Sequence, residues 1–257
     1  MKNKKAALHI HSYYSDGFFA PSVIVGYAKI AGIGVLSITD HNEIKGTISA
    51  MRIAEKIGLI YFPGIELTFS VSGRPYELLA YFYNIKNIKK FYDSYRFNNG
   101  FIPSYNSVDE VFNLVKRHKG IVIVPHPFGR KGIYRKGRNR HIKPEGIEVL
   151  NAFTGEKRNL KALSHNDCSQ CIKIGAADMH FFINDISKTY TEIVGKKITK
   201  REIWENLSRN KKTLKFNPIG KKFPTYKISI QKPLCILSYG ISYPRLYFLY
   251  LRNKINE

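Results

Sequence analysis

The chain has 257 residues, of which 44% are hydrophobic and 13% aromatic; this composition excludes a disordered polypeptide and suffices for one sizeable folded core. Its 42 lysines and arginines outnumber its 19 acidic residues, giving a formal charge of +23. The excess favours anionic partners such as phosphorylated small molecules, nucleic acid or an acidic membrane surface, although a solvated basic surface explains it equally well.

The cysteines and the N-terminus indicate a cytoplasmic chain. Three cysteines are too few for a disulfide scaffold, and Cys168 and Cys171 form a lone CSQC without the second pair that a zinc knuckle needs. We therefore expect reduced cysteines. The stretch MKNKKAALHIH lacks the apolar run of a signal peptide, and no run of roughly 18 apolar residues predicts a membrane-spanning helix.

The first part of the chain alternates between apolar runs of strand length and helix-like segments. Strands are expected at residues 6–10, 34–39, 59–62 together with 64–67, and 76–83. Helices are expected at residues 21–31 and 45–57. Pro21 suits the first turn of a helix, because the N–H that proline lacks has no partner there in any case.

The same alternation continues through the second part of the chain. Two capping boxes mark helix starts, Ser107 with Glu110 and Thr199 with Glu202, and the first of these helices is expected to end near residue 119. Further strands are expected at residues 120–124, 146–150, 172–177 and 191–194. Strands that alternate with helices predict an α/β fold with a mainly parallel sheet.

Residues that can bind metal lie at or just after the carboxyl ends of these predicted strands. They are His9, His11, Asp40, His41, Glu66, His126, Asp178 and His180. The carboxyl ends of parallel strands in a barrel share one face, so these side chains are expected to converge. Residues two apart in a strand point the same way, so that His9 and His11 can bind one ion together. Any one of these residues alone is more often an ordinary polar group or a loop cap, but their joint placement predicts a metal site.

Five stretches carry a resemblance to a known family. LHIHSYYSDG, ITDHNEIKG, PGIEL, PHPF and AADMH are similar, in this order, to the successive motifs of the polymerase and histidinol phosphatase (PHP) superfamily, and the resemblance covers roughly residues 6–215. It implies a distorted (β/α)7 TIM-like barrel over residues 1–216, with residues 217–257 as a basic and aromatic C-terminal appendage. It also implies two or three divalent metal ions (manganese, zinc or iron) and the hydrolysis of phosphate esters.

The resemblance assigns ligands by motif position. His9, His11, Glu66 and Asp178 would hold a first ion, Glu66 and His126 a second, and Asp16, His41 and His180 a third. The sequence departs from the family pattern at Glu77, in PYELLAYF, where members have a histidine. A carboxylate can bind a hard cation such as manganese or magnesium, so Glu77 is expected to be a ligand; the alternative is that the second site is weak.

The segment after His126 reads PFGRKGIYRKGRNRHIK and is dense in basic residues. Arg130 and Lys131, and less strongly Arg138, are expected to bind the phosphate of a substrate, because basic side chains neutralise its oxygens. A solvated mobile loop is the alternative. Asp40 completes the expected catalytic set as the acid that protonates the leaving alcohol after attack by a metal-bound hydroxide; otherwise it orients a ligand histidine.

Three functions remain open. The first is a phosphoesterase acting on a phosphorylated small molecule, and the second a nuclease or oligonucleotide phosphodiesterase with the same site, which the charge favours although no RRM, KH or zinc-finger motif is present. The third is a metal-retaining, non-catalytic scaffold at a membrane or on RNA. It depends on residues 233–251, PLCILSYGISYPRLYFLYL, whose composition suits peripheral membrane contact, or equally packing on the barrel or on a second protomer.

Overall fold

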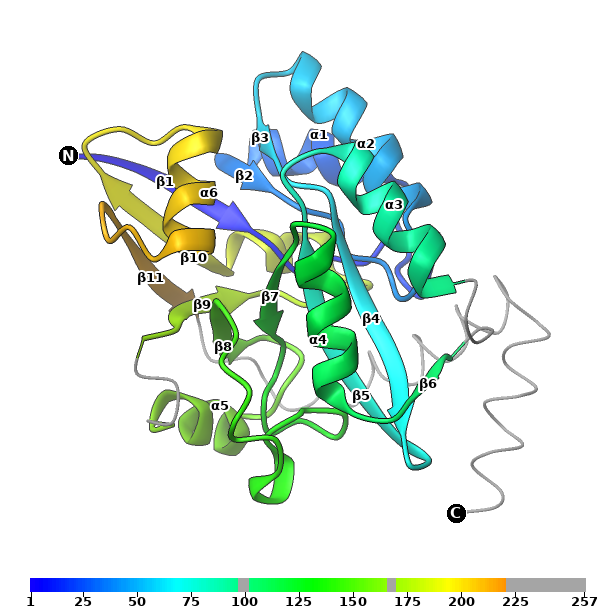
Figure 1. Ribbon diagram of the computed structural model, residues 1–257. Coiled ribbons are helices and arrows are strands. Elements are labelled where there is room, and N and C mark those ends of the chain that lie inside the picture. The colour runs from blue at the N-terminus through cyan, green and yellow to red at the C-terminus, as the bar shows by residue number, and fades with distance from the viewer. Residues whose placement is uncertain (97–101, 166–169, 221–257) are drawn as a thin grey trace.

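The computed structural model describes residues 1–96, 102–165 and 170–220, whose strands form two sheets (Figure 1). The five-stranded sheet has the order β11-β10-β1-β2-β3, and the six-stranded sheet the order β6-β4-β5-β7-β8-β9. The strands of the first sheet are β1 (Lys2–Ala7), β2 (Ile33–Leu36), β3 (Ile60–Tyr61), β10 (Thr189–Gly195) and β11 (Leu214–Gly220). Those of the second are β4 (Gly64–Val71), β5 (Arg74–Tyr81), β6 (Ser104–Tyr105), β7 (Ile121–Val124), β8 (Gly146–Asn151) and β9 (Ile172–Ala176).

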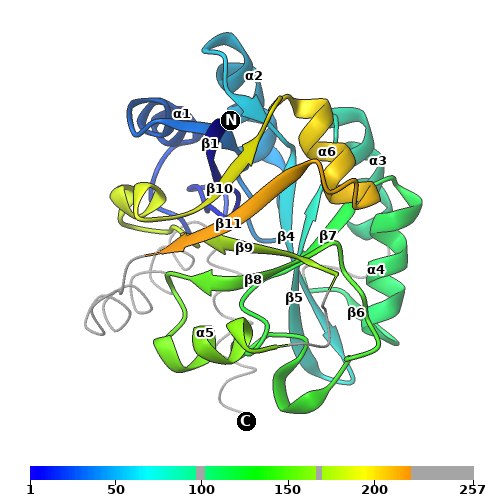
Figure 2. The ribbon, with the colours of Figure 1, turned by 90° about the vertical axis from the view of Figure 1, so that its left-hand side faces the viewer.

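The two sheets meet along two lines. On one side β11 lies beside β9, with β8 beyond it (Figure 2). Two isolated parallel bridges, Ile10 with Met179 and His41 with Glu66, also connect the sheets. Through these bridges a circuit of strands closes on itself, in the order β1, β2, β4, β5, β7, β8, β9 and back to β1. The predicted α/β class is confirmed, with a strand circuit that is interrupted rather than continuously paired.

The expectation of a mainly parallel sheet was wrong, because both sheets are mixed. β5 is antiparallel to both of its neighbours, β4 and β7, and β10 is antiparallel to β1 and β11. The reversal between β4 and β5 is a tight hairpin in which Val71 pairs with Arg74. Its two loop residues, Ser72 and Gly73, have φ of +49° and +73°, as a hairpin turn with two left-handed residues requires. The Ser-Gly dipeptide was the sequence signal for this turn.

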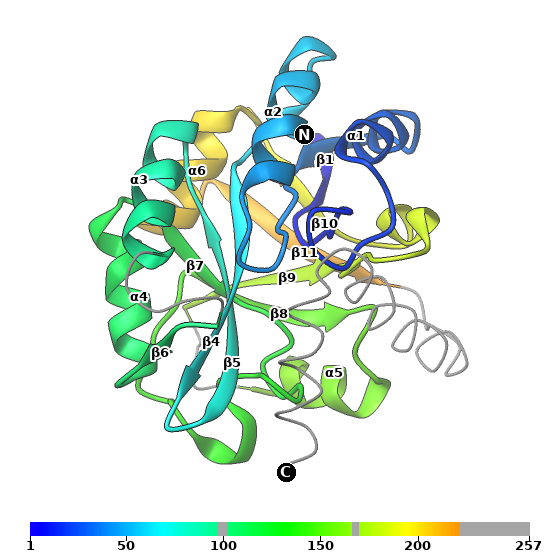
Figure 3. The ribbon, with the colours of Figure 1, turned by 90° about the vertical axis from the view of Figure 1, so that its right-hand side faces the viewer.

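Helices cover the outer faces of the sheets (Figure 3). They are α1 (Pro21–Ile30), α2 (Lys45–Lys56), α3 (Ile85–Arg96), α4 (Val108–Arg117), α5 (Glu156–Leu163) and α6 (Lys200–Arg209). The predicted N-caps form at the starts of α4 and α6, where Ser107 Oγ and Thr199 Oγ1 accept hydrogen bonds at 3.2 Å from the backbone N of Glu110 and Glu202. The sequence reading missed α3 and α5. In α3 the buried residues Ile88, Phe91 and Tyr95 follow helical spacing, so its signal was present.

The core behind the site lies between the second sheet and the helices α3 and α4. Phe69, Leu78, Phe91 and Val111 are fully buried there. Full burial of one such side chain contributes about 1.5–3 kcal/mol. This packing holds β4 and β5, the two strands that carry acidic side chains of the site, in one rigid unit.

The C-terminal part of the described chain extends the first sheet. β11 crosses the predicted boundary at residue 216, and its Pro218 pairs with Thr191 of β10, so residues 217–220 belong to the sheet. The segment 233–251 lies outside the described residues. No helix within the described part of the chain has the length and apolar character needed to cross a membrane. Cys171 is disulfide-bonded, which departs from the expectation of reduced cysteines.

Candidate metal centre

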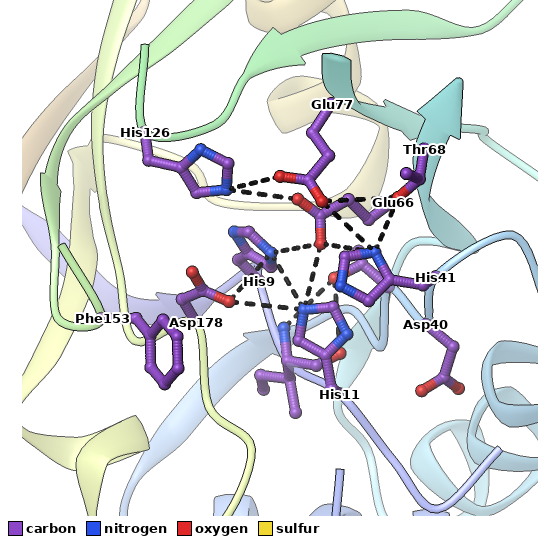
Figure 4. Close-up of polar contacts among 12 residues, drawn as sticks. His9, His11, Asp40, His41, Glu66, Thr68, Glu77, His126, Phe153 and Asp178 are labelled. Atoms are coloured by element: carbon purple, nitrogen blue, oxygen red, sulfur yellow. Dashed lines mark hydrogen bonds and ion pairs between the residues drawn. The ribbon is translucent and has the colours of Figure 1, made fainter. Parts of the chain in front are cut away.

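Histidines and carboxylates from distant parts of the chain point toward one another, among them His9, His11, His41, His126, Glu66, Glu77 and Asp178 (Figure 4). His9, His11 and Asp16 follow β1, His41 follows β2, His126 follows β7, and Asp178 and His180 follow β9. Glu66 lies inside β4 and not at a strand end as expected, whereas Glu77 lies inside β5. They still reach the centre, because the hairpin register pairs Thr68 with Glu77, and this places Glu66, Thr68 and Glu77 on one face.

A first cluster consists of four side-chain atoms at nearly equal separations. His9 Nε2 lies 3.1 Å from His11 Nε2, 3.1 Å from Glu66 Oε2 and 3.3 Å from Asp178 Oδ1. His11 Nε2 lies 3.2 Å from Glu66 Oε2 and 3.3 Å from Asp178 Oδ1. Ligand atoms about 2.0 Å from a tetrahedral ion are about 3.3 Å apart. The ring nitrogens of His9 and His11 together with Glu66 Oε2 therefore form a mutually close group that can hold a divalent ion, and Asp178 Oδ1 lies within 3.3 Å of both ring nitrogens.

The chemistry of these atoms also fits a cation. His9 Nδ1 lies 2.8 Å from Glu148 Oε1, and the carboxylate can only accept, so the ring donates its Nδ1–H. In a neutral ring His9 Nε2 is then bare and faces the other atoms of the first cluster. Lone pairs that face one another in a buried site repel unless a cation lies between them, and a bare imidazole nitrogen with its other N–H held by a carboxylate is the usual form of a metal ligand.

A second cluster joins Glu66 and Glu77 to His126. His126 Nε2 lies 3.4 Å from Glu66 Oε1 and 3.5 Å from Glu77 Oε2. Glu66 Oε1 is buried and accepts no hydrogen bond from the described residues. Such an unsatisfied carboxylate oxygen is costly to bury and requires a partner. Because its other oxygen belongs to the first cluster, Glu66 can bridge two neighbouring ions.

A third cluster surrounds Asp16. Its carboxylate lies 3.5 Å from His11 Nδ1, 3.8 Å from His41 Nε2 and 3.4 Å from His180 Nε2. His180 Nδ1 is 2.9 Å from the backbone oxygen of Asp178, so the ring donates there and leaves Nε2 bare toward Asp16. His41 connects this cluster to the second, because its Nδ1 lies 3.3 Å from Glu66 Oε2. The ligand sets assigned by resemblance are thus adjacent, and they share residues.

Backbone strain is present at two of these residues. His126 has φ of +26° and Asp178 has φ of +49°. Non-glycine residues rarely adopt this left-handed region, and they persist there only when the surrounding structure holds them. Both conformations turn a side chain into the clusters immediately after a strand ends.

The protonation equilibria follow from burial and charge pairing. Burial alone would lower the pKa of His11, but its contacts with Asp178 and Glu66 raise the pKa to about 10. Burial likewise opposes protonation of His126, whereas Glu66 and Glu77 raise its pKa to about 9. Against the effect of burial, neighbouring histidines hold the pKa of Asp16 far below its usual range. Without bound ions the site is thus a network of histidinium–carboxylate pairs.

The three basic candidates occupy different positions. Lys131 Nζ donates to Glu77 Oε1 at 2.5 Å, directly beside the second cluster. Arg130 is exposed, and its backbone oxygen accepts a hydrogen bond from Arg135 Nη1. Arg138 follows the short 3-10 turn Arg135–Gly137 and is partly exposed. Of the three, the structure brings Lys131 into contact with a residue of the clusters.

Asp40 lies outside the clusters, and its carboxylate points away from the histidines (Figure 4). It is fully buried and accepts hydrogen bonds from Ser12 N at 2.6 Å, Ser12 Oγ at 2.7 Å and Ser15 Oγ at 2.8 Å. A side chain on Gly46 would collide with it, because a Cβ there would lie 1.9 Å from Asp40 Oδ2. Through these contacts Asp40 supports the loop after His11, and its role as proton donor stays a prediction.

Sequence reasoning missed Glu148 as a member of the site. This buried residue of β8 also accepts a hydrogen bond from the backbone N of His126 at 2.9 Å and from Asn151 Nδ2 at 2.9 Å. Asn151 Nδ2 reaches Asp178 Oδ2 as well, at 3.1 Å. Glu148 therefore connects ligand candidates of the first and second clusters. An isolated acid in the otherwise apolar run GIEVL was the available signal.

The fold and these clusters define a class: an α/β protein whose histidines and carboxylates converge at a site that can bind metal. A comparison with family models identifies the family, because the PHP domain model matches residues 7–221. The chain belongs to the PHP family. This confirms the resemblance carried by the five motifs.

Three similar proteins span different shares of the chain. An uncharacterized protein of Methanocaldococcus jannaschii is 29% identical over 160 residues, which are 58% of this chain and 82% of that protein. A 5'-3' exoribonuclease of Haemophilus influenzae is 37% identical over 77 residues, which are 30% of this chain and 28% of that enzyme. A two-domain protein of Bacteroides vulgatus containing a predicted PHP-like metal-dependent phosphoesterase matches 80% of this chain and 64% of its own, with a TM-score of 0.58 and 18% identity. The last likeness concerns the fold alone.

Proposed function

We propose that this protein is a metal-dependent phosphoesterase that hydrolyses a phosphate ester, using divalent ions held by the clustered histidines and carboxylates. The observation that carries the proposal is the first cluster, in which His9 Nε2 and His11 Nε2 lie 3.1 Å apart and each lies within 3.3 Å of Glu66 Oε2 and of Asp178 Oδ1. Divalent ions bound there would lower the pKa of water to near neutrality and neutralise phosphate charge.

The residues of the chain would position this chemistry. Glu66 Oε2 lies beside His9 of the first cluster and His41 of the third, so Glu66 would keep the ions of these clusters close together. Neighbouring ions suit an in-line displacement at phosphorus, because the entering and the leaving oxygen can each be stabilised. Glu148 would hold His9 and the backbone of His126 in place, which limits reorganisation during reaction.

The substrate would be an anion that the basic exterior attracts. The formal charge of +23 contrasts with the acidic centre, where Asp16, Glu66, Glu77, Glu148 and Asp178 gather. Bound divalent ions would turn this centre into a receptor for phosphate. Arg130 and Arg138, on the loop that follows His126, are proposed to bind the remaining oxygens of a phosphorylated small molecule.

A nucleic-acid substrate is the second candidate. It is supported by the similarity to a 5'-3' exoribonuclease over 30% of this chain and by the charge. A nuclease that tracks several phosphates would lose activity steeply as salt rises, whereas hydrolysis of a small monoester would depend on salt weakly. Turnover of a short oligonucleotide and of a nucleoside monophosphate, each measured between low and moderate salt, separates the two candidates.

The proposal is tested with metal-stripped protein and a panel of phosphomonoesters and phosphodiesters. We expect no turnover without metal and recovery when manganese or zinc is added back. His9→Ala should abolish the recovered activity, whereas the matched variant His141→Ala should retain it, because His141 is exposed and contacts Asp109 away from the clusters. Equal turnover by wild type and His9→Ala would overturn the proposed site.

A further inference from the structure

The second cluster already contains a cation that belongs to the chain. Lys131 Nζ donates a charge-assisted hydrogen bond to Glu77 Oε1, with the two atoms 2.5 Å apart. The other oxygen of Glu77 faces His126 Nε2 at 3.5 Å. Glu77 therefore offers one oxygen to an ammonium group and one to the cluster.

The loop that carries Lys131 is anchored, which distinguishes it from the solvated basic loop considered from the sequence. Glu77 N donates to the backbone oxygen of Lys131 at 3.0 Å, so the two residues are joined by main chain as well as side chain. A Cβ on Gly132 would lie 2.4 Å from the oxygen of Pro127. The next residue, Ile133, is fully buried in the core. Lys131 is thus directed at Glu77 by a tight, packed turn.

An ammonium at this position competes with a metal ion for the same carboxylate. Glu77 is buried, and a buried carboxylate needs an opposite charge beside it. Lys131 supplies that charge. A divalent ion seated between Glu66, Glu77 and His126 would face the ammonium across one carboxylate group, and like charges in a poorly solvated site repel strongly.

We propose that the Lys131 ammonium occupies the cation position at Glu77 in place of a metal ion, so that the centre binds one ion fewer than its histidines and carboxylates could hold. The inference rests on the proposed metal centre but not on the proposed reaction. In this role Lys131 is a built-in counter-charge rather than a ligand for substrate phosphate.

The test is the number of ions bound per chain, measured without substrate. Wild type and Lys131→Met are dialysed against a series of manganese concentrations, and again against zinc, and the bound metal is determined by elemental analysis. Methionine keeps the length of the lysine side chain and removes its charge. We expect Lys131→Met to bind about one more ion per chain than wild type, because the Glu77 carboxylate loses its counter-charge.

Three further variants make the measurement decisive. Lys131→Arg keeps the charge and should bind as many ions as wild type. Lys136→Met removes an exposed charge from the same loop and should also match wild type. Lys131→Gln neutralises the position while keeping a hydrogen bond to Glu77, and should gain the ion even if Lys131→Met fails to fold. Circular dichroism checks that each variant is folded.

The outcomes separate this inference from the metal centre itself. If wild type binds metal and both neutral variants bind the same number of ions or fewer, Lys131 does not stand in for an ion and the inference is wrong. If neither wild type nor the variants bind metal, the metal centre fails, and the inference with it. Neither outcome depends on enzymatic turnover, because only bound metal is measured.

Discussion

Glu148 Oε1 lies 2.8 Å from His9 Nδ1, and this contact determines which nitrogen of His9 faces the first cluster. A carboxylate can accept only, so a neutral His9 ring turns a bare Nε2 toward His11, Glu66 and Asp178. The other oxygen of Glu148 accepts from the backbone of His126. One buried acid of β8 thereby orients residues of two clusters.

Replacing Glu148 with glutamine tests this role. Glutamine retains one acceptor oxygen, so it cannot accept from His9 and from the His126 backbone at the same time. Loss of such supporting hydrogen bonds typically weakens metal binding about 10–100-fold. The measurement is a competition titration against a chromophoric chelator, with Asp109→Asn as an exposed control. Unchanged affinity in Glu148→Gln would show that His9 is oriented without it.

Metal binding should release protons. In the ion-free protein carboxylates raise the pKa of His126 to about 9 and that of His11 to about 10, despite the opposing effect of burial. Both rings are therefore protonated at pH 7, and an ion must displace those protons to reach the nitrogens. Apparent affinity should rise with pH and level off only above these pKa values. Calorimetry in two buffers of different protonation enthalpy at pH 7 measures the release; identical heats would contradict it.

Removing the metal should destabilise the fold. An ion present at about 100 times its dissociation constant stabilises the native state by about 2.7 kcal/mol. For a chain of this size that corresponds to a fall in Tm of about 5–10 °C on chelation. Differential scanning calorimetry with and without a chelator measures the change. Glu66→Ala, which removes the shared carboxylate, should show little response to the chelator; a response as large as in wild type would place the stabilising ion elsewhere.

Replacing Asp40 with asparagine tests whether this residue has a structural or a catalytic role. Asp40→Asn loses an acceptor for the hydroxyl or backbone N–H groups of Ser12 and Ser15. Leaving a buried donor unsatisfied costs about 1–3 kcal/mol, so urea unfolding should show a lower free energy of unfolding. A proton donor would behave differently, with kcat reduced and the unfolding midpoint unchanged; that pattern would restore Asp40 to the reaction.

Much of the site could be located from the sequence because its residues follow short apolar strands. The pairs after β1 and β9, together with His41 and His126, needed only the rule that parallel strand ends share a face. Glu66 and Glu77 were identified as candidates, although Glu66 was expected at the end of its strand and lies inside β4. Their positions depend on the Ser72–Gly73 hairpin, which reverses β5 and was not recognised.

The roles of other residues depend on tertiary contacts that cannot be predicted from a local sequence pattern. Glu148 sits in an apolar strand, and its importance comes from reaching across to His9, which is 139 residues away in the chain. The pairing of Lys131 with Glu77 depends on a tight turn after His126. The basic composition of this segment had instead suggested that Lys131 binds the phosphate of a substrate. Asp40 was expected to be the proton donor, and no local pattern showed that Ser12 and Ser15 donate hydrogen bonds to its carboxylate.

The most direct measurement is anomalous diffraction from crystals grown with manganese or zinc. The proposed centre predicts a peak enclosed by His9 Nε2, His11 Nε2, Glu66 Oε2 and Asp178 Oδ1, about 2.0–2.2 Å from each atom. Saturating metal that leaves no anomalous peak among these four atoms would contradict the account.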